Sequence, residues 1–232
     1  MKLAIMQPYL FPYLGYFQLI HAVDKFVVYD DVSFIKQGWI NRNNLLLNGR
    51  AHMFSVPIAH MSSYSLISET QIAKNDLWKS KFLKTLRQAY ERAPYFQSCF
   101  EIIQRVIQSA ENSIAALAVN GIKEVCDYCS IKTAIRETSV DYRNAQLKSQ
   151  SRVIDICVKE QATEYVNLSG GVSIYTKEAF DEHHIQLRFI RMKNVEYAQF
   201  GNGFIPSLSI IDVMMFNSKE QITELLKQFE LT

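Results

Sequence analysis

The chain has no excess of charge of either sign. Its 25 Lys and Arg residues stand against 23 Asp and Glu residues, which gives a formal net charge of +2. The cationic residues are scattered, whereas a nucleic-acid-binding surface needs many of them on one stripe to neutralise phosphates. Nucleic acid is therefore not the expected partner.

Long hydrophobic runs are also missing. The N-terminal segment MKLAIMQPYL holds a short apolar stretch that ends at proline, whereas a membrane span needs about 20 apolar residues. We therefore expect no signal peptide, no membrane insertion and a cytoplasmic location. Glycine and proline are sparse, and no repeat or Gly- or Pro-rich linker divides the sequence, so we expect one domain over residues 1–232.

Cysteine and histidine are too few and too poorly spaced to predict a metal site. Cys126 and Cys129 form a Cys-x-x-Cys pair within IKEVCDYCSI, where they share one helix face with Ile122 and Val125. No second pair with zinc-like spacing accompanies them. We interpret these cysteines as core residues and predict no metal.

Hydrophobic residues make up 48% of the chain and indicate a globular protein. The first 30 residues predict a strand at Lys2–Met6, a loop, a helix over 16–24 and a buried strand at Lys25–Tyr29. Two apolar strands around one helix favour a parallel crossover. Ligands of such sheets bind at the carboxyl ends of the strands, which here are Gln7–Gly15 and Asp30 onward.

The rest of the pattern extends this α/β arrangement. A mainly helical segment is predicted around 76–130, which makes the expected fold a Rossmann-like parallel sheet with an inserted helical region. The other expected elements are a hairpin of 45–47 and 53–57 around Asn48-Gly49, a polar stretch at 60–68, strands at 133–140, 163–168 and 185–191, and helices at 152–160, after Gly171, at 205–217 and at 218–229.

The loop that follows the first strand is the first candidate site. Free backbone N–H groups and the helix dipole at a strand-to-helix loop favour an anion such as phosphate. Its polar and aromatic side chains are costly to bury without partners. The alternative is that a loop rich in Pro and Tyr simply packs. The candidate residues are Gln7, Tyr9, Tyr13, Gly15 and Tyr16.

The second candidate is the polar cluster after the second strand. Asp30 and Asp31 can split roles, because mutual repulsion raises the pKa of one of two close carboxyls. Adjacent residues on a strand end point to opposite sides, so only one of them need face a pocket. The alternative is loop capping with an ion pair to Lys36 or Arg42. Other members of this cluster are Trp39, Asn41 and Asn43.

Two weaker candidates lie further along the chain. Asn167, Ser169, Gly170 and Gly171 form a turn where the backbone can approach a ligand, although a tight turn explains the same residues. Asp212 lies on a strongly apolar helix near serines at capping positions, which makes it more interesting than a surface carboxylate.

Four separated blocks carry a family resemblance over nearly the whole chain. MQPYLFPYLGYFQLIHAVDKFVVYDDV, KQGWINRN, YVNLSGG and LSIIDVMMFN together resemble the WbqC-like family of bacterial surface-polysaccharide gene clusters. This resemblance implies a role in making a sugar component of O-antigen (lipopolysaccharide) or a related glycan.

The first block also resembles, more distantly, the nucleotidylyltransferase and acid–amine ligase superfold with its His-x-Gly-His loop. The corresponding tetrapeptide here is Tyr13-Leu14-Gly15-Tyr16, so both histidines are absent. In that superfold the histidines stabilise nucleotide phosphates, so their loss argues against adenylate formation. Tyrosine still donates hydrogen bonds and stacks on rings.

The leading functional hypothesis is a transferase that N-acylates, or aminoacylates (for example glycylates), the amino group of a nucleotide-linked deoxyamino sugar. Asp30 or Asp31 serves as general base, and Tyr9, Tyr16 and Asn41 act as catalytic donors. The first loop, Lys36, Arg42 and the Gly-Gly turn hold the diphosphate, and the other candidate residues contact the substrate.

Several questions stay open at this point. The activated acyl donor is an aminoacyl-tRNA, an acyl-CoA, or ATP with an amino acid. One alternative is a glycosyltransferase or other nucleotide-sugar enzyme, in which the Asp pair holds a divalent metal. Another is a non-catalytic binding module of the assembly machinery. The sequence does not determine the oligomeric state.

Overall fold

A computed structural model describes residues 1–60, 65–201 and 203–232 of the chain. Four of the expected polar residues at 60–68 lie outside the described part. The strands are β1 (Lys2–Met6), β2 (Lys25–Val28), β3 (Arg42–Leu47), β4 (Arg50–Ser55), β5 (Ala134–Arg136), β6 (Glu164–Leu168), β7 (Gln186–Met192) and β8 (Phe229–Leu231). The α-helices are α1 (Leu14–His21), α2 (Leu77–Tyr90), α3 (Phe96–Gln108), α4 (Ile114–Tyr128), α5 (Ser149–Lys159), α6 (Lys177–Asp181), α7 (Ile210–Phe216) and α8 (Lys219–Leu226).

The central sheet has the strand order β5-β2-β1-β6-β7-β8. The strands from β5 to β7 pair in parallel, and β8 adds an antiparallel edge. The chain moves from β1 outward to β2 and β5, and then to β6 on the other side of β1. This reversal beside β1 is the switch point of a Rossmann-like α/β fold, so the predicted fold class is confirmed.

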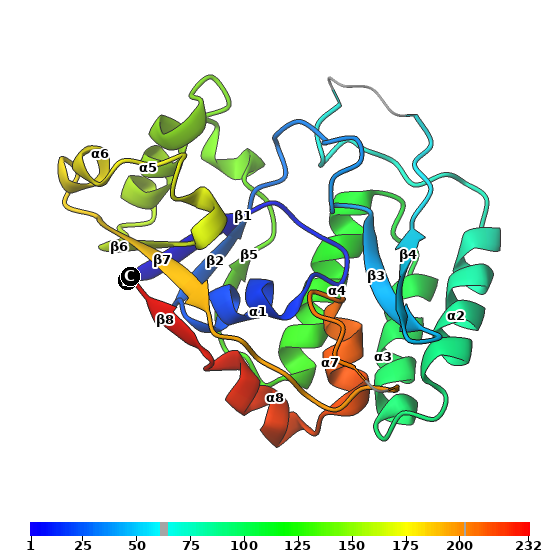
Figure 1. Cartoon of the computed structure of the whole chain (residues 1–232). Helices are drawn as coiled ribbons and strands as arrows, with labels where there is room; N and C mark the ends of the chain where they lie inside the picture. The colour runs from blue at the N-terminus through cyan, green and yellow to red at the C-terminus, as the bar shows by residue number, and fades with distance from the viewer. Residues whose placement is uncertain (61–64, 202) are drawn as a thin grey trace.

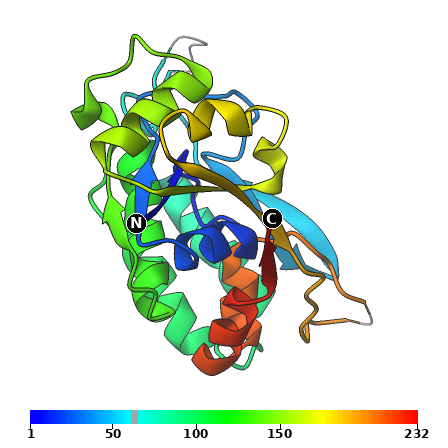
Figure 2. The same ribbon diagram turned by 90° about the vertical axis from the view of Figure 1, so that its left-hand side faces the viewer.

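Helices cover both faces of this sheet, as Figures 1 and 2 show. Side chains alternate along each strand, so Leu3 and Ile5 pack into the cluster under α5 and α6, whereas Ala4 joins the larger cluster on the opposite face. The larger cluster also includes residues of α1, α3, α4, α7 and α8. Both faces of β1 are therefore buried, which explains its unbroken apolar pattern.

A two-stranded hairpin stands apart from the central sheet. The hairpin of β3 and β4 turns at Asn48 and Gly49, whose φ angles of 52° and 71° are those of the predicted Asn-Gly turn. Phe54 of β4 packs on Phe82 of α2, with ring centroids 4.8 Å apart. Figure 1 shows the hairpin beside α2, so this part of the fold forms an extra layer next to the sheet.

The structure differs from the sequence-based expectation at two strands. The strand expected over 133–140 is only Ala134–Arg136, because Thr138 and Ser139 turn away to hydrogen-bond Asp30. The helix expected to run to residue 229 stops at Leu226, and the next residues form β8. Thr232 and Phe189 exchange two backbone hydrogen bonds of 2.9 Å that hold this edge.

A buried ion pair joins the end of β2 to α5. Arg152 of α5 donates to a carboxylate oxygen and to the backbone carbonyl of Asp31, and only 4% and 8% of the two side chains are exposed. Arg152 also lies over the Tyr29 ring, 4.9 Å from its centroid. Asn144 accepts a further hydrogen bond from the Arg152 Nε at 2.9 Å. The guanidinium is thus surrounded by acceptors and a ring face, which offset its desolvation.

Replacing Arg152 by Met should leave the Asp31 carboxylate buried without its cation. We expect the free energy of unfolding to fall by about 3–5 kcal/mol, measured by urea denaturation. The exposed Arg136–Asp141 pair supplies the control, because Asp141→Asn should change it by about 1 kcal/mol or less. Similar effects of the two substitutions would contradict a structural role for the buried pair.

Candidate functional site

The loops after β1, β2, β5 and β6 gather at one edge of the sheet, as the parallel pairing requires (Figure 1). This edge carries the sequence-predicted residues of the first three candidate segments. The structure distributes their side chains among three environments: an aromatic cleft, a buried hydrogen-bond network and a separate cavity that Asp30 lines.

The β1–α1 loop is held by two distant segments of the chain. The Phe11 carbonyl accepts hydrogen bonds from Asn43 Nδ2 at 2.8 Å and Ser209 Oγ at 2.7 Å. The Pro12 carbonyl accepts from the Ile210 N–H at 2.8 Å, and the Leu10 N–H donates to the Ile40 carbonyl at 3.0 Å. Three of the four sequence blocks that carry the family resemblance therefore meet at this loop.

Two adjoining cavities form what we call the aromatic cleft. The first has a volume of about 210 Å³ and is lined by Tyr9, Pro12, Tyr13, Trp39, Asn43 and Ser207. The second has a volume of about 450 Å³ and shares Tyr13 and Ser207 with the first. Its other walls are Leu14, Val213 and residues from 192–197, 204, 206 and 208. The cleft thus joins ring faces to a more polar second compartment.

The three tyrosines of the loop have different roles. Tyr16 is fully buried, and its hydroxyl donates to the Gln7 carbonyl at 2.7 Å, so this side chain supports the loop rather than facing the cleft. Tyr9 and Tyr13 line the cleft. Burial raises the pKa of both hydroxyls, which therefore stay protonated and act as hydrogen-bond donors at neutral pH.

The start of α1, where the sequence predicts an anion site, is closely packed at Gly15. The Tyr16 N–H donates to the Tyr13 carbonyl at 3.1 Å. A Cβ placed on Gly15 would lie 2.2 Å from Met192 Sδ and 2.5 Å from the Tyr13 ring, so this position requires glycine. Tyr13 and Leu14 line the second compartment, and the anion site stays a prediction.

The segment at 36–43 divides between exposed and structural residues. Trp39 is 46% exposed, and the Arg42 guanidinium lies 5.7 Å from its ring centroid while donating from Nε to the Gly38 carbonyl at 2.8 Å. Lys36 is exposed at the surface. Asn41 is buried and donates to the Val56 carbonyl at 2.8 Å, so it holds the entry to the hairpin instead of facing the cleft.

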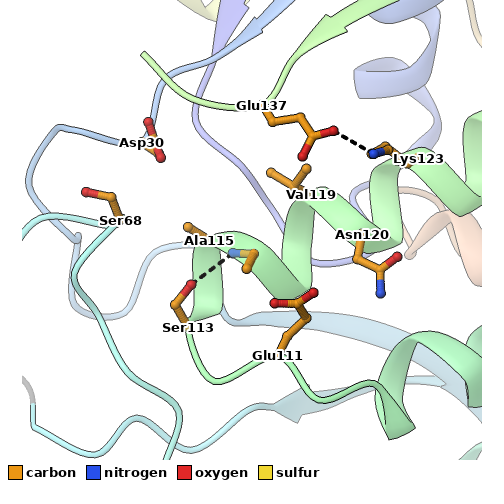
Figure 3. Close-up of a pocket in the computed structure, with 10 residues that line it drawn as sticks. Asp30, Ser68, Glu111, Ser113, Ala115, Val119, Asn120, Lys123 and Glu137 are labelled. Carbon is orange, nitrogen blue, oxygen red and sulfur yellow. Dashed lines mark hydrogen bonds and ion pairs between the residues drawn. The ribbon is translucent and has the colours of Figure 1, made fainter. Parts of the chain in front are cut away.

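The two adjacent aspartates share the Ser139 hydroxyl but otherwise have different partners. Both carboxylate oxygens of Asp31 are bonded, one to Arg152 and one to the Ser139 hydroxyl. Asp30 Oδ1 accepts from Thr138 Oγ1 and the Ser139 N–H, each at 2.9 Å. Asp30 also lines a separate cavity, shown in Figure 3. Of the two aspartates, Asp30 is therefore the one that lines a cavity.

The Gly-Gly segment forms a short 3-10 turn over Ser169–Gly171. A Cβ on Gly171 would lie 2.8 Å from Asn167 Nδ2, whereas a Cβ on Gly170 would contact nothing within 4 Å. Asn167 is buried and accepts from the Leu168 N–H at 2.7 Å. Ser169 is exposed. None of these four residues lines the aromatic cleft.

Asp212 is the hub of a buried network behind the cleft. Its carboxylate accepts from the hydroxyls of Tyr90 and Tyr197, each at 2.8 Å, and from Gln199 Nε2 at 2.7 Å. Gln199 also exchanges two hydrogen bonds with the backbone of Ile205. Asp212 is therefore a positioning residue for Tyr197, which lines the second compartment, and for Gln199.

Sequence reasoning missed this wall. Lys193, Glu196, Tyr197 and Phe204 line the cleft but lie in an irregular segment with no recognisable motif. The only local signal is the mixture of aromatic and polar residues in KNVEYAQFGNGF.

The described residues include no group of three or more His, Cys, Asp or Glu side chains close enough to hold a metal ion. None of the helices in residues 1–60, 65–201 and 203–232 has the length and apolar character needed to cross a bilayer.

Asp212 should give the protein a pH-dependent stability. Burial raises the pKa of Asp212 against the opposing effect of its three hydrogen bonds, so the folded state binds the proton more tightly than the unfolded state. The contribution of Asp212 to stability is then greatest below the usual pKa of aspartate and falls as pH rises through the raised value. Between about pH 4 and about pH 7, we therefore expect the melting temperature of Asp212→Asn to fall less, or rise more, than that of the wild type.

The exposed residue Asp127, in the last turn of α4, provides the control for this measurement. The melting temperature of Asp127→Asn should change with pH in the same way as that of the wild type. A curve for Asp212→Asn that also runs parallel to the wild type would show that the buried carboxyl does not titrate in this window.

The family relationship follows from comparison with known proteins. The chain is 29% identical over 229 residues to the "Uncharacterized protein Rv1507c" of Mycobacterium tuberculosis (strain ATCC 25618 / H37Rv), and the alignment covers 97% of each chain. No solved structure matches the chain. The model of the WbqC-like protein family matches residues 7–224, which include the β1–α1 loop, both compartments of the cleft and Asp212. The chain therefore belongs to the WbqC-like protein family.

Proposed function

We propose that this protein is a transferase of surface-polysaccharide biosynthesis that acylates or aminoacylates the amino group of a nucleotide-linked deoxyamino sugar. The observation that carries the proposal is the aromatic cleft, in which three ring-bearing residues, Tyr9, Tyr13 and Trp39, surround one cavity with Asn43 and Ser207 at its edge. Ring faces bind the apolar faces of sugars and bases, and a few polar groups fix their orientation.

The size and the charges of the cleft suit a ligand with two parts. The aromatic compartment is small and faces the exposed Trp39, whereas the second compartment is larger and contains Lys193 and Glu196. Arg42 lies against the outer ring of Trp39. Lys193 and Arg42 would therefore hold a diphosphate that joins a sugar in one compartment to a nucleoside in the other.

The tyrosines supply the chemistry of an acyl transfer. Attack of an amine on an acyl carbonyl places negative charge on the carbonyl oxygen, and a positioned O–H donor stabilises that charge. The hydroxyls of Tyr9 and Tyr13 are protonated and line the cleft. In this scheme the neutral amine attacks the acyl carbon directly, the bond from that carbon to the oxygen or sulfur of the donor breaks, and the proton lost by the nitrogen passes to the leaving group. Burial raises the pKa of the Cys129 and Cys157 thiols to about 12, which disfavours a thiolate nucleophile.

The alternatives make different demands on the structure. A glycosyltransferase in which Asp30 and Asp31 jointly hold a divalent metal needs both carboxylates, but Asp31 is paired with Arg152. A non-catalytic binding module needs only the cleft. The acyl donor is an aminoacyl-tRNA, an acyl-CoA, or ATP with an amino acid. Assays with each of these three donors in turn identify which one supports the reaction.

Removing the ring of Trp39 should weaken ligand binding. Loss of one aromatic platform removes about 1–3 kcal/mol of stacking, so Trp39→Ala should raise the Kd for a nucleoside-diphosphate amino sugar by roughly 5- to 150-fold. Isothermal titration calorimetry with UDP-, GDP- and dTDP-linked amino sugars measures this change.

The matched control removes another exposed apolar side chain. Met53 of β4 is 49% exposed and outside the cleft, so Met53→Ala should bind like the wild type. If the wild-type protein binds none of these nucleotide sugars, the proposal fails. If it binds them but the sugar gains no mass with any of the three donors, the binding module replaces the transferase.

A further inference from the structure

An acyl transfer to an amine needs a group that takes a proton from the nitrogen. Primary amines are mostly protonated at neutral pH, and an ammonium nitrogen has no lone pair with which to attack. The sequence predicts Asp30 or Asp31 as the base, but neither residue lines either compartment of the aromatic cleft. Asp31 is paired with Arg152. The cleft therefore needs another proton acceptor.

Tyr197 joins the cleft to a buried carboxylate. Tyr197 lines the second compartment, and its hydroxyl donates to Asp212 Oδ2 at 2.8 Å. Gln199 Nε2 lies 3.5 Å from the same hydroxyl oxygen but only 2.7 Å from Asp212. A hydroxyl oxygen has two lone pairs, so at least one of those on Tyr197 is left to accept from a ligand. Tyr197 is thus able to link an ammonium group in the second compartment to Asp212.

The surroundings of Asp212 suit a proton acceptor. Asp212 is fully buried on α7, and its titratable neighbours are Tyr90 from α2 and Tyr197 from the segment after β7. Among the described residues, no ion pair includes Asp212. A buried carboxylate without a cation is a stronger base than one in water, and burial raises the pKa of Asp212 accordingly. The other titratable residues that line the compartment of Tyr197 are Tyr13, Lys193 and Glu196.

We propose that Tyr197 and Asp212 form a proton relay, in which Tyr197 is the catalytic residue that contacts the amine and Asp212 is the acceptor behind it. The inference rests on the proposed function. An N–H bond of the ammonium breaks as its proton moves to Tyr197 Oη, and the proton of Tyr197 moves to Asp212 Oδ2. The products are a neutral amine, a neutral tyrosine and a neutral carboxylic acid. Asp212 returns its proton to water through Tyr197 before the next cycle.

The pH dependence of the rate tests the acceptor. Asp212→Asn keeps the size of the side chain, but only amine that has lost its proton to water then reacts. About a tenth of an amine with a pKa near 8 is neutral at pH 7, so kcat should fall about tenfold there. It should recover as pH rises toward the pKa of the amine. A purely structural loss would lower kcat by one factor at every pH.

Two tyrosine variants provide a matched pair. Tyr90 and Tyr197 each donate one hydrogen bond to Asp212, but only Tyr197 lines the cleft. Tyr197→Phe should therefore shift the pH profile as Asp212→Asn does. Tyr90→Phe should keep the wild-type profile, although it removes the acceptor of the Leu46 N–H and lowers the melting temperature. Glu196→Gln tests the exposed carboxylate of the same compartment.

Infrared difference spectroscopy detects the relay without acyl transfer. The full chain is mixed near neutral pH with the UDP-, GDP- or dTDP-linked amino sugar that binds in calorimetry. The C=O stretching band of a protonated carboxylic acid should appear with the free amine and be absent with its N-acetylated form. The band should also be absent in Asp212→Asn.

Three results would overturn the relay: wild-type pH profiles in folded Asp212→Asn and Tyr197→Phe, loss of activity at low pH in Glu196→Gln alone, or no acid band when the free amine binds. Each of them is compatible with acylation of the sugar and so leaves the transferase intact. An acid band without acylation by any donor contradicts only the transferase. Failure of every nucleotide amino sugar to bind contradicts both proposals.

Discussion

The buried carbonyl groups of the β1–α1 loop are the constraint on which the candidate site depends. Phe11 is fully buried with a φ of 46°, and its carbonyl must find donors in a region that water does not reach. It finds them in Asn43, which comes 32 residues later, and Ser209, which comes 198 residues later. Satisfying one carbonyl therefore brings three remote segments together. The aromatic cleft forms where these segments meet.

The end of β2 shows how consecutive residues can serve different purposes. Asp31 joins β2 to α5 through Arg152, and Asp30 joins β2 to the loop after β5 through Thr138 and Ser139. The carboxylates of Asp30 and Asp31 also share the Ser139 hydroxyl, so both side chains hold the loop after β5 against the end of β2.

Local patterns predicted the parts of the fold that local physics determines. The apolar runs of β1 and β2, the Asn-Gly hairpin and the long helices from residue 77 onward all follow from periodicity and turn chemistry. β8 escaped prediction because three residues are too short to show alternation, and its pairing with β7 is a tertiary contact.

The candidate site was predictable only in outline, because tertiary contacts between distant segments determine the rest of it. The sequence placed Tyr9, Tyr13, Trp39 and Asn43 near one another because strand ends meet at one edge of a sheet. It gave no sign that Arg152 would be the partner of Asp31, since those residues are 121 positions apart. Lys193 and Tyr197 of the cleft wall lie outside any helix or strand, and the position of Tyr197 depends on the buried Asp212 network.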